Sequence, residues 1–146
     1  MTPKILVLTV GLPRSGKTTW ARHLAASHAS IPIVNPDSIR LAMHGQRFVA
    51  EAEPLVWAIA KIAVRALFLA GHDTVIVDAT NTTQKRRDEW LNPAWTTCFK
   101  FFSPSPADCI KRAQATGDTE IIPVIEKMYN QFEPLTETED LRRWNI

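Results

Sequence analysis

The sequence predicts an α/β fold in which a parallel sheet of about four strands is sandwiched between helices. Three observations predict it. Short apolar, β-branched segments alternate along the 146 residues with segments of helical periodicity. Residues 4–10 and 75–77 are almost entirely apolar, which is typical of strands buried on both faces. Glycine, proline and capping residues separate the segments, and this alternation favours parallel strands joined by right-handed crossovers.

Four segments are predicted to be strands. Residues 4–10 (KILVLTV) form a continuous apolar run that ends at Gly11. The other three candidates are residues 31–34, 73–81 and 95–102. Each is short and rich in β-branched or aromatic side chains, which favours a strand over a helix.

Helices are predicted between the strands and after the last one. The candidates are residues 17–28, 36–44, 51–70 and 82–91, a segment that begins at Pro106 and one that begins at Pro123. Asn35 and Ser105 are predicted N-caps, because each is followed by a proline that suits the first helical position. In the longest helix one apolar face is predicted to pack on the sheet, with Leu55, Ile59, Ile62, Ala66 and Leu69.

The segment between the first strand and the first helix predicts a phosphate-binding loop. GLPRSGKT fits the pattern G-x-x-x-x-G-K-S/T in full and lies between a strand and a helix, as that pattern requires. Backbone N–H groups of such a loop, with the helix N-terminus, surround the phosphates, and Lys17 reaches the β- and γ-phosphates. The candidate nucleotide-binding residues are Gly11, Pro13, Arg14, Ser15, Gly16, Lys17, Thr18 and Thr19. The loop therefore predicts binding of ATP or GTP.

Asp78 is the candidate metal ligand at the end of the third strand. It follows the apolar residues 75–77, which is the position of a Walker-B-type aspartate that holds Mg²⁺. The Thr18 hydroxyl is the second candidate ligand. The alternative is that Asp78 caps the following helix. Asn81, three residues later, suits either a helix cap or a substrate contact.

Asp37 and Arg40 follow the second strand and are candidate catalytic residues. The carboxyl ends of parallel strands meet at one edge of a sheet, so both residues are expected beside the phosphate-binding loop. Asp37 suits a general base for an attacking hydroxyl, and Arg40 suits an anionic group on the acceptor. The alternative is that Asp37 only stabilises a helix N-terminus and that Arg40 is a surface residue.

Several segments together resemble the kinase domain of the phage-type polynucleotide 5′-kinases. These are GLPRSGKTTWAR, NPDSIR, VDATNTTQKRRDEW, IKRAQATG and IIPVIEKMY, in that order. The phage-type kinases are one branch of the P-loop kinases, which also include zeta-toxin-like and tRNA-ligase-associated kinases. The resemblance implies that Lys17 and Thr18 serve ATP and Mg²⁺ and that Asp37 is the general base. It also implies that Arg40 binds a 3′-phosphate of the acceptor.

The resemblance further implies a small C-terminal helical lid, at about residues 105–120, that carries Arg112 over the triphosphate. The family has a second lid arginine immediately before the glycine that aligns with Gly117. Here that position is Thr116. A hydroxyl does not replace a guanidinium that neutralises phosphate charge. Arg112 acts alone, or another basic residue such as Arg14 substitutes, or the kinase is weak.

Composition limits the remaining possibilities. The chain has a net charge of +2 and is 45% hydrophobic, which predicts one ordinary globular domain over residues 1–146. The longest apolar stretches are too short to cross a membrane and no secretory signal pattern is present, so a cytoplasmic protein is expected. The run Lys85-Arg86-Arg87 is either a basic rim for a polynucleotide or a solvated face. Trp57, Trp90 and Trp95 are expected in the core rather than as base-stacking platforms.

The sequence thus predicts a kinase that transfers the γ-phosphoryl group of ATP to a hydroxyl. The favoured acceptor is the 5′-hydroxyl end of DNA or RNA. The alternatives are a small-molecule acceptor, such as a nucleoside, sugar or antibiotic, and a non-catalytic module that binds ATP. The proposed catalytic set is Lys17, Asp37, Arg40 and Arg112.

Overall fold

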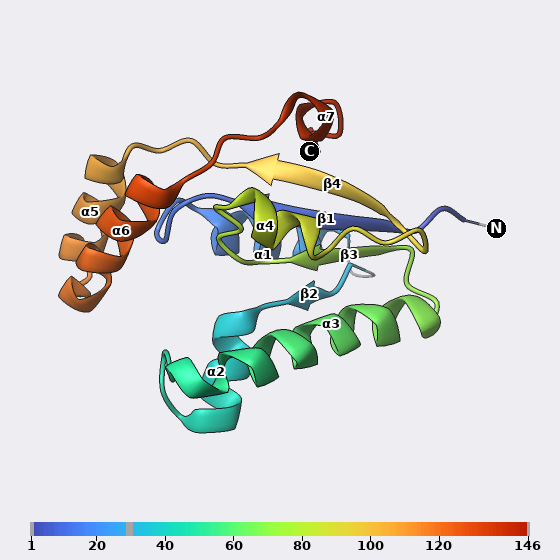
Figure 1. Cartoon of the computed structure of the whole chain (residues 1–146), viewed down its shortest axis with the longest axis horizontal. Coiled ribbons are helices and arrows are strands. Elements are labelled where there is room, and N and C mark those ends of the chain that lie inside the picture. Colours follow the sequence, from blue (N-terminus) through green and yellow to red (C-terminus); the bar gives the residue numbers. More distant parts are fainter. Residues whose placement is uncertain (1, 29–30, 146) are drawn as a thin grey trace.

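Four parallel strands form the centre of the fold, in the order β2-β3-β1-β4 (Figure 1). The computed structural model describes residues 2–28 and 31–145, so residues 1, 29–30 and 146 of the expected domain lie outside the described residues. The strands are β1 (Ile5–Val10), β2 (Ile33–Val34), β3 (Thr74–Val77) and β4 (Thr96–Phe101). All their pairings are parallel, which confirms the predicted α/β fold.

The α-helices between and after the strands are α1 (Lys17–Ser27), α2 (Pro36–His44), α3 (Glu53–Leu69), α4 (Gln84–Asp88), α5 (Pro106–Ala115), α6 (Ile122–Gln131) and α7 (Glu137–Asp140). The helices α1 to α6 follow the prediction, although α4 is shorter than the predicted residues 82–91, and α7 was not predicted. Short 3₁₀ helices, η1 (Ala50–Ala52) and η2 (Thr119–Ile121), precede α3 and α6. Asn35 and Ser105 accept hydrogen bonds from the first turns of α2 and α5, as predicted.

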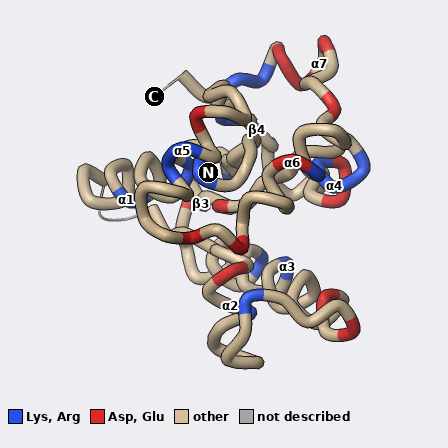
Figure 2. The backbone as a smooth tube through the Cα atoms, turned by 90° about the vertical axis from the view of Figure 1, so that its left-hand side faces the viewer, with Lys and Arg blue, Asp and Glu red and all other residues tan. Residues whose placement is uncertain are grey.

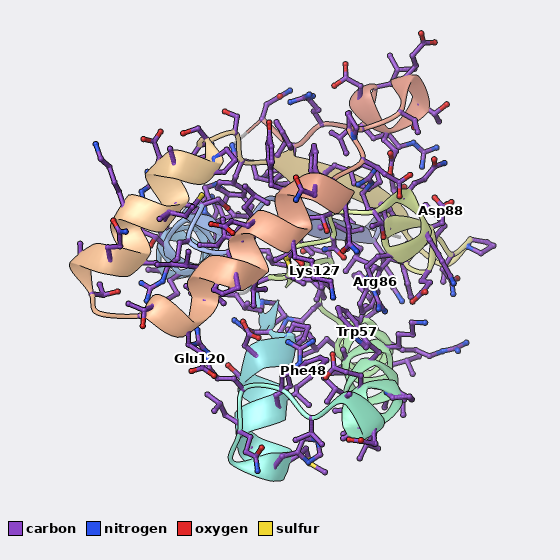
Figure 3. All side chains as sticks on the ribbon, turned by 60° about the vertical axis from the view of Figure 1, so that its left-hand side comes forward. Phe48, Trp57, Arg86, Asp88, Glu120 and Lys127 are labelled. Carbon is purple, nitrogen blue, oxygen red and sulfur yellow. The ribbon has the colours of Figure 1, made fainter. Side chains whose placement is uncertain are left out.

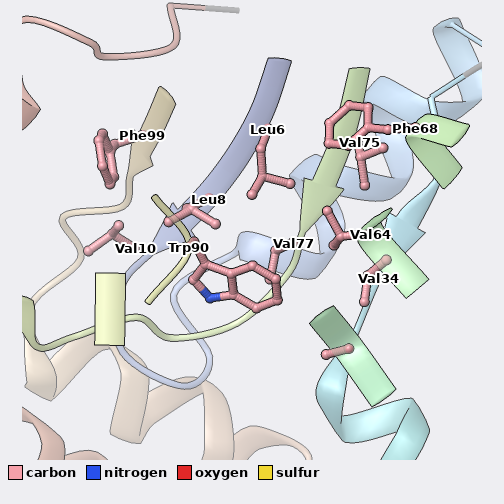
Figure 4. Packing of buried hydrophobic residues seen from close by; sticks show 11 residues of the cluster. Leu6, Leu8, Val10, Val34, Val64, Phe68, Val75, Val77, Trp90 and Phe99 are labelled. Atoms are coloured by element: carbon pink, nitrogen blue, oxygen red, sulfur yellow. The ribbon is translucent and has the colours of Figure 1, made fainter. Parts of the chain in front are cut away.

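Helices cover both faces of the sheet. On one face Ala60, Val64 and Phe68 of α3 pack with Trp90 against inward-facing residues of the strands (Figure 4). On the other face Ala21 and Leu24 of α1 pack against the sheet. The central strands β1 and β3 are buried on both faces and are almost entirely apolar, whereas the edge strand β4 also carries Thr96, Thr97 and Lys100.

The prediction of which face of α3 is buried was wrong. The buried residues are Val56, Ala60, Val64 and Phe68, whereas Leu55, Ile62 and Leu69 are 47%, 68% and 78% exposed. The helix is apolar nearly all the way round, so two different rows of residues satisfy the helical period.

Helices α5 and α6 pack on each other beyond the carboxyl ends of the strands (Figure 1). Cys109, Ala113 and Ile125 form a small apolar core between them, and Leu12 of the phosphate-binding loop belongs to that core. This α5–α6 hairpin is therefore fixed directly to the loop. No helix in the described part of the chain has the length and apolar character needed to cross a membrane.

Candidate active site

The conformation of the loop between β1 and α1 depends on two of its glycines, Gly11 and Gly16. Gly16 has a φ of 103° and Arg14 a φ of 67°, so both lie in the left-handed region. A Cβ atom on Gly11 would come within 2.7 Å of Ser15 Oγ and 3.0 Å of Phe102 Cβ. Gly11 is thus required by close packing, and Gly16 by the backbone turn that opens α1.

Lys17 is the buried cation of the loop. Its Nζ donates to the carbonyl of Leu12 at 2.5 Å and to Ser15 Oγ at 3.3 Å, and the residue is only 7% exposed. Burial lowers the pKa of Lys17 to about 8, and the nearby charges of Asp78, Cys109 and Asp37 oppose this shift. The ammonium group thus lies in a poorly hydrated position where an anion would stabilise its charge.

Asp78 connects the phosphate-binding loop with the end of β2. Its Oδ2 accepts a hydrogen bond from Thr18 Oγ1 at 2.7 Å and another from Asn35 Nδ2 at 3.0 Å. Burial raises the pKa of Asp78, whereas these two hydrogen bonds and the charge of Lys17 lower it. A hydroxyl and a carboxylate at hydrogen-bonding distance are hard oxygen donors, which fits a Mg²⁺ site shared with phosphate oxygens.

Asp37 and Arg40 lie one turn apart on α2, at the same edge of the sheet. Arg40 Nη1 donates to Asp37 Oδ1 at 2.7 Å. The Asp37 side chain is 80% exposed, so it is accessible to an acceptor. Its negative charge acts to raise the pKa of both Lys17 and Asp78.

Glu53, which sequence reasoning missed, holds Arg40 in place. Its carboxylate accepts two hydrogen bonds from Arg40, from Nε at 2.9 Å and from Nη2 at 2.7 Å. The hydrogen bonds with Arg40 lower the pKa of Glu53, against the effect of burial. Because Glu53 begins a different helix, the local sequence around Arg40 carries no signal for this pair.

A second cluster, also missed, joins the α5–α6 hairpin to the phosphate-binding loop. Asp118 accepts hydrogen bonds from Arg14 at 2.9 Å and from Arg47 at 2.8 and 2.9 Å. These guanidinium groups hold the pKa of Asp118 at about 2. Arg112, predicted on the lid, donates from Nη1 to the carbonyl of Arg14 at 3.0 Å. Three arginines from three segments therefore gather at the loop.

The three residues of the basic run Lys85-Arg86-Arg87 have different environments. Arg87 is fully buried and pairs with Glu139 at 2.8 Å, so it is a structural residue. Lys85 is exposed. Arg86 lies over the ring of Trp57, 4.0 Å from its centroid. Asn81 does not cap α4, because Thr83 does.

Asn81 instead lies buried beside the site and donates from Nδ2 to the carbonyl of Thr9 at 2.9 Å. Its Oδ1 is buried and has no hydrogen-bond partner among the described residues. The residue has a φ of 44°, which an asparagine tolerates better than most side chains. The substrate-contact alternative for Asn81 therefore stays open, and the cap alternative is wrong.

Comparison with known proteins places this chain in a family. A family whose model is described as an AAA domain matches residues 6–135. Among solved structures, one described as a Pnkp1/Rnl/Hen1 complex is 27% identical with a TM-score of 0.70. That match covers 77% of this chain and 40% of the other, so the chain spans less than half the length of that relative.

Two further structures show the same fold at lower identity. A gluconokinase from Sinorhizobium meliloti 1021 is 20% identical, with a TM-score of 0.65 over 97% of this chain and 80% of the other. A fungal RNA kinase is 14% identical, with a TM-score of 0.63 over 98% of this chain and 72% of the other. The neighbours thus include kinases of both polynucleotides and small molecules.

Proposed function

We propose, from the premise that the chain belongs to the AAA-domain family of P-loop kinases, that it transfers the γ-phosphoryl group of ATP to a 5′-hydroxyl end of a polynucleotide. One observation carries the proposal. Thr18 of the phosphate-binding loop and Asn35 beside the acceptor helix both donate to the same oxygen of Asp78. Groups suited to the phosphate donor and to the acceptor therefore meet at one carboxylate.

On the donor side, the loop residues 11–19 would surround the phosphates of ATP, and Lys17 would exchange its bonds to Leu12 and Ser15 for phosphate oxygens. Thr18 and Asp78 would hold Mg²⁺. The metal, when bound, neutralises negative charge on the phosphate oxygens. Asn35 keeps the Asp78 carboxylate oriented through its hydrogen bond.

On the acceptor side, Asp37 would accept the proton of the 5′-hydroxyl. The hydroxyl oxygen then bonds to the γ-phosphorus as the bond to the β–γ bridging oxygen breaks, and ADP leaves. Arg40, fixed by Glu53, keeps the Asp37 carboxylate in position and places positive charge beside the acceptor. The exposure of Asp37 leaves room for a polymer end.

The α5–α6 hairpin would act as the lid. Thr116 offers no positive charge, but Arg112 and Arg14 lie against the loop, and Arg47 shares Asp118 with Arg14. Movement of these arginines from Asp118 to the phosphates would supply charge that the position of Thr116 lacks.

A small-molecule acceptor is the second candidate. The match to the gluconokinase covers 80% of that chain, against 40% for the Pnkp1 complex, and the net charge of +2 is modest. A short acceptor would need only Asp37 and Arg40.

An acceptor panel decides between the two. Labelled γ-phosphate from ATP is offered to 5′-hydroxyl DNA and RNA oligonucleotides, gluconate, other sugars and nucleosides. We expect label at oligonucleotide 5′ ends, with Lys17→Ala inactive. Transfer to one metabolite and to no oligonucleotide would contradict the polynucleotide assignment. Tight ATP binding with no product on any acceptor would favour a non-catalytic module.

A further inference from the structure

Helices α3 and α4 enclose an open groove of about 420 Å³ beside the acceptor site. Its lining combines an apolar floor, the name used here for Pro54, Trp57 and Ala58, with charged residues that include Lys61 and Arg86. Figure 2 shows both basic and acidic residues on α3 and α4, so these helices form no track of one sign. Figure 3 shows the side chains of Trp57 and Arg86 next to each other.

Trp57 and Arg86 form a layered pair within this groove. The Arg86 guanidinium lies 4.0 Å from the centroid of the indole ring, and the ring packs edge-on against Trp90 at 6.4 Å. Trp57 packs against the apolar core as expected, but it is only half-buried. A planar guanidinium on an indole is a surface on which any nucleobase can stack, because every base presents a π face.

The groove is continuous with the acceptor site. Glu53 lines the groove and also accepts both hydrogen bonds from Arg40, which in turn donates to Asp37. If the terminal hydroxyl of a polynucleotide lies at Asp37, its next nucleotide therefore reaches the groove beside Arg40. A sugar or nucleoside that binds at Asp37 is too short to occupy both places.

The charges of the groove suit an exchangeable phosphate. Lys61 Nζ and Arg86 Nη1 lie 3.6 and 3.1 Å from the same oxygen, Glu89 Oε2. The Lys61, Arg86 and Glu89 side chains are 45%, 35% and 32% exposed, so solvent weakens both pairs. Glu89 thus holds two cations loosely, in an arrangement that a backbone phosphate of the acceptor reproduces.

We propose that the α3–α4 groove binds the second nucleotide of a single-stranded acceptor. The base stacks on Arg86 and Trp57, and the phosphate lies between Lys61 and Arg86 in place of the Glu89 carboxylate. The inference rests on the proposed function and deepens it, since it makes the groove the part of the molecule that selects a polymer over a metabolite.

The test compares acceptors of different length. A nucleoside 3′-phosphate, a trinucleotide and a decamer are phosphorylated by the wild type, Trp57→Ala, Trp57→Phe and Lys61→Gln. Because Trp57 also contacts Arg40, we expect Trp57→Ala to raise KM for the decamer about tenfold or more with little change in kcat, and to raise KM for the mononucleotide much less. Trp57→Phe retains most of the affinity because it keeps a stacking face. Equal effects on mononucleotide and decamer, or none on either, would overturn the proposal.

Lys61→Gln tests the phosphate contact without disturbing the floor of the groove. It should weaken binding of the decamer and reduce the slope of log affinity against log salt by about 0.7. Arg65→Gln is the matched control, since Arg65 is an exposed cation on the same helix that does not line the groove. An equal effect of the two substitutions would mean that binding depends only on the net charge of the protein, and would contradict a site at Lys61.

Anisotropy of a labelled decamer, measured without ATP, separates this proposal from the proposed function. If no acceptor is phosphorylated, the proposed function fails, yet binding lost in Trp57→Ala and kept in Trp57→Phe still supports the groove. Decamer binding that is absent, or unchanged in Trp57→Ala, overturns the groove even if the enzyme phosphorylates mononucleotides. Thermal unfolding of each variant identifies any that fail to fold. If Trp57→Ala does not fold, the comparison of Lys61→Gln with the wild type tests the groove.

Discussion

At the scale of single residues, Lys17 carries a charge whose burial in the free protein is unfavourable. Its ammonium group is buried, and its pKa of about 8 lies below the usual lysine value of 10.5. Between these two values the unfolded chain binds more protons at this residue than the folded chain does. The contribution of Lys17 to stability therefore improves as pH rises from about 8 to about 10.5.

This gives a pH-dependent prediction for Lys17→Met. The difference in free energy of unfolding between the wild type and the variant should shift in favour of the wild type by up to about 3 kcal/mol across that pH window. Urea denaturation of both proteins at pH 7, 8.5 and 10 measures it. A difference that does not change with pH would mean that Lys17 is not desolvated in the free protein.

Glu53 gives a second prediction at this scale. Glu53→Gln removes the charge that holds Arg40, and Arg40 is then oriented by Asp37 alone. We expect kcat/KM for the acceptor to fall about tenfold or more, while the affinity for ATP stays the same. Glu51→Gln, an exposed neighbour, is the control. A loss of ATP affinity equal to the loss of acceptor efficiency would place Glu53 outside the acceptor site.

At the scale of elements, Asp118 ties the α5–α6 hairpin to two other segments, the phosphate-binding loop and the segment after α2. Because arginines lower its pKa to about 2, the tie is complete above about pH 4 and is lost as pH falls toward 2. Its strength at neutral pH is therefore constant. Both arginines are partly exposed, so the tie orders the segments more than it stabilises the fold.

Asp118→Asn should therefore loosen the hairpin at neutral pH without unfolding the protein. We expect faster amide hydrogen exchange in α5 and in residues 45–49, with a loss of less than about 1 kcal/mol in global stability. Glu120→Gln is the matched control, because Glu120 is 81% exposed and lies 3.5 Å from Arg47. Unchanged exchange in both segments would contradict a coupling role for Asp118.

The elements also show what the sequence could predict. Strands, caps and the loop were predictable because each depends on residues close in sequence, such as Asn35 before Pro36. The buried face of α3 was not predictable, because an almost wholly apolar helix has no unique apolar face. Packing against neighbouring elements determines which face is buried. Glu53 and Arg40 are separated by 13 positions in the sequence, and Asp118 and Arg14 by 104 positions. No local pattern encodes such pairs.

At the scale of the whole molecule, the last residues of the chain fasten the sheet. The buried Arg87 pairs with Glu139 of α7 and donates to the carbonyls of Asn81, Glu133 and Pro134. Arg142 and Trp144 exchange backbone hydrogen bonds with Phe99 of β4. The segment that leaves β3 toward the active site is thus fixed by residues from the far end of the sequence.

Arg87→Met should consequently destabilise the protein by about 3–5 kcal/mol, because it leaves the Glu139 carboxylate and three carbonyls without their partner. Denaturant unfolding measures the loss, with Lys85→Met on the same helix as control. The double variant Arg87→Met, Glu139→Met should recover part of it. A loss below about 1 kcal/mol for the single variant would mean that the pair is not needed for the fold.

The central claim is that Asp37 activates a 5′-hydroxyl for attack on ATP. Its most direct test is the rate of labelled phosphate transfer to a 5′-hydroxyl oligonucleotide by the wild type, Asp37→Asn and the exposed control Asp88→Asn, with ATP affinity measured for each. We expect Asp37→Asn to lower kcat about 100-fold or more with ATP affinity unchanged, and Asp88→Asn to resemble the wild type. Equal rates for the wild type and Asp37→Asn would show that Asp37 does not act as the base.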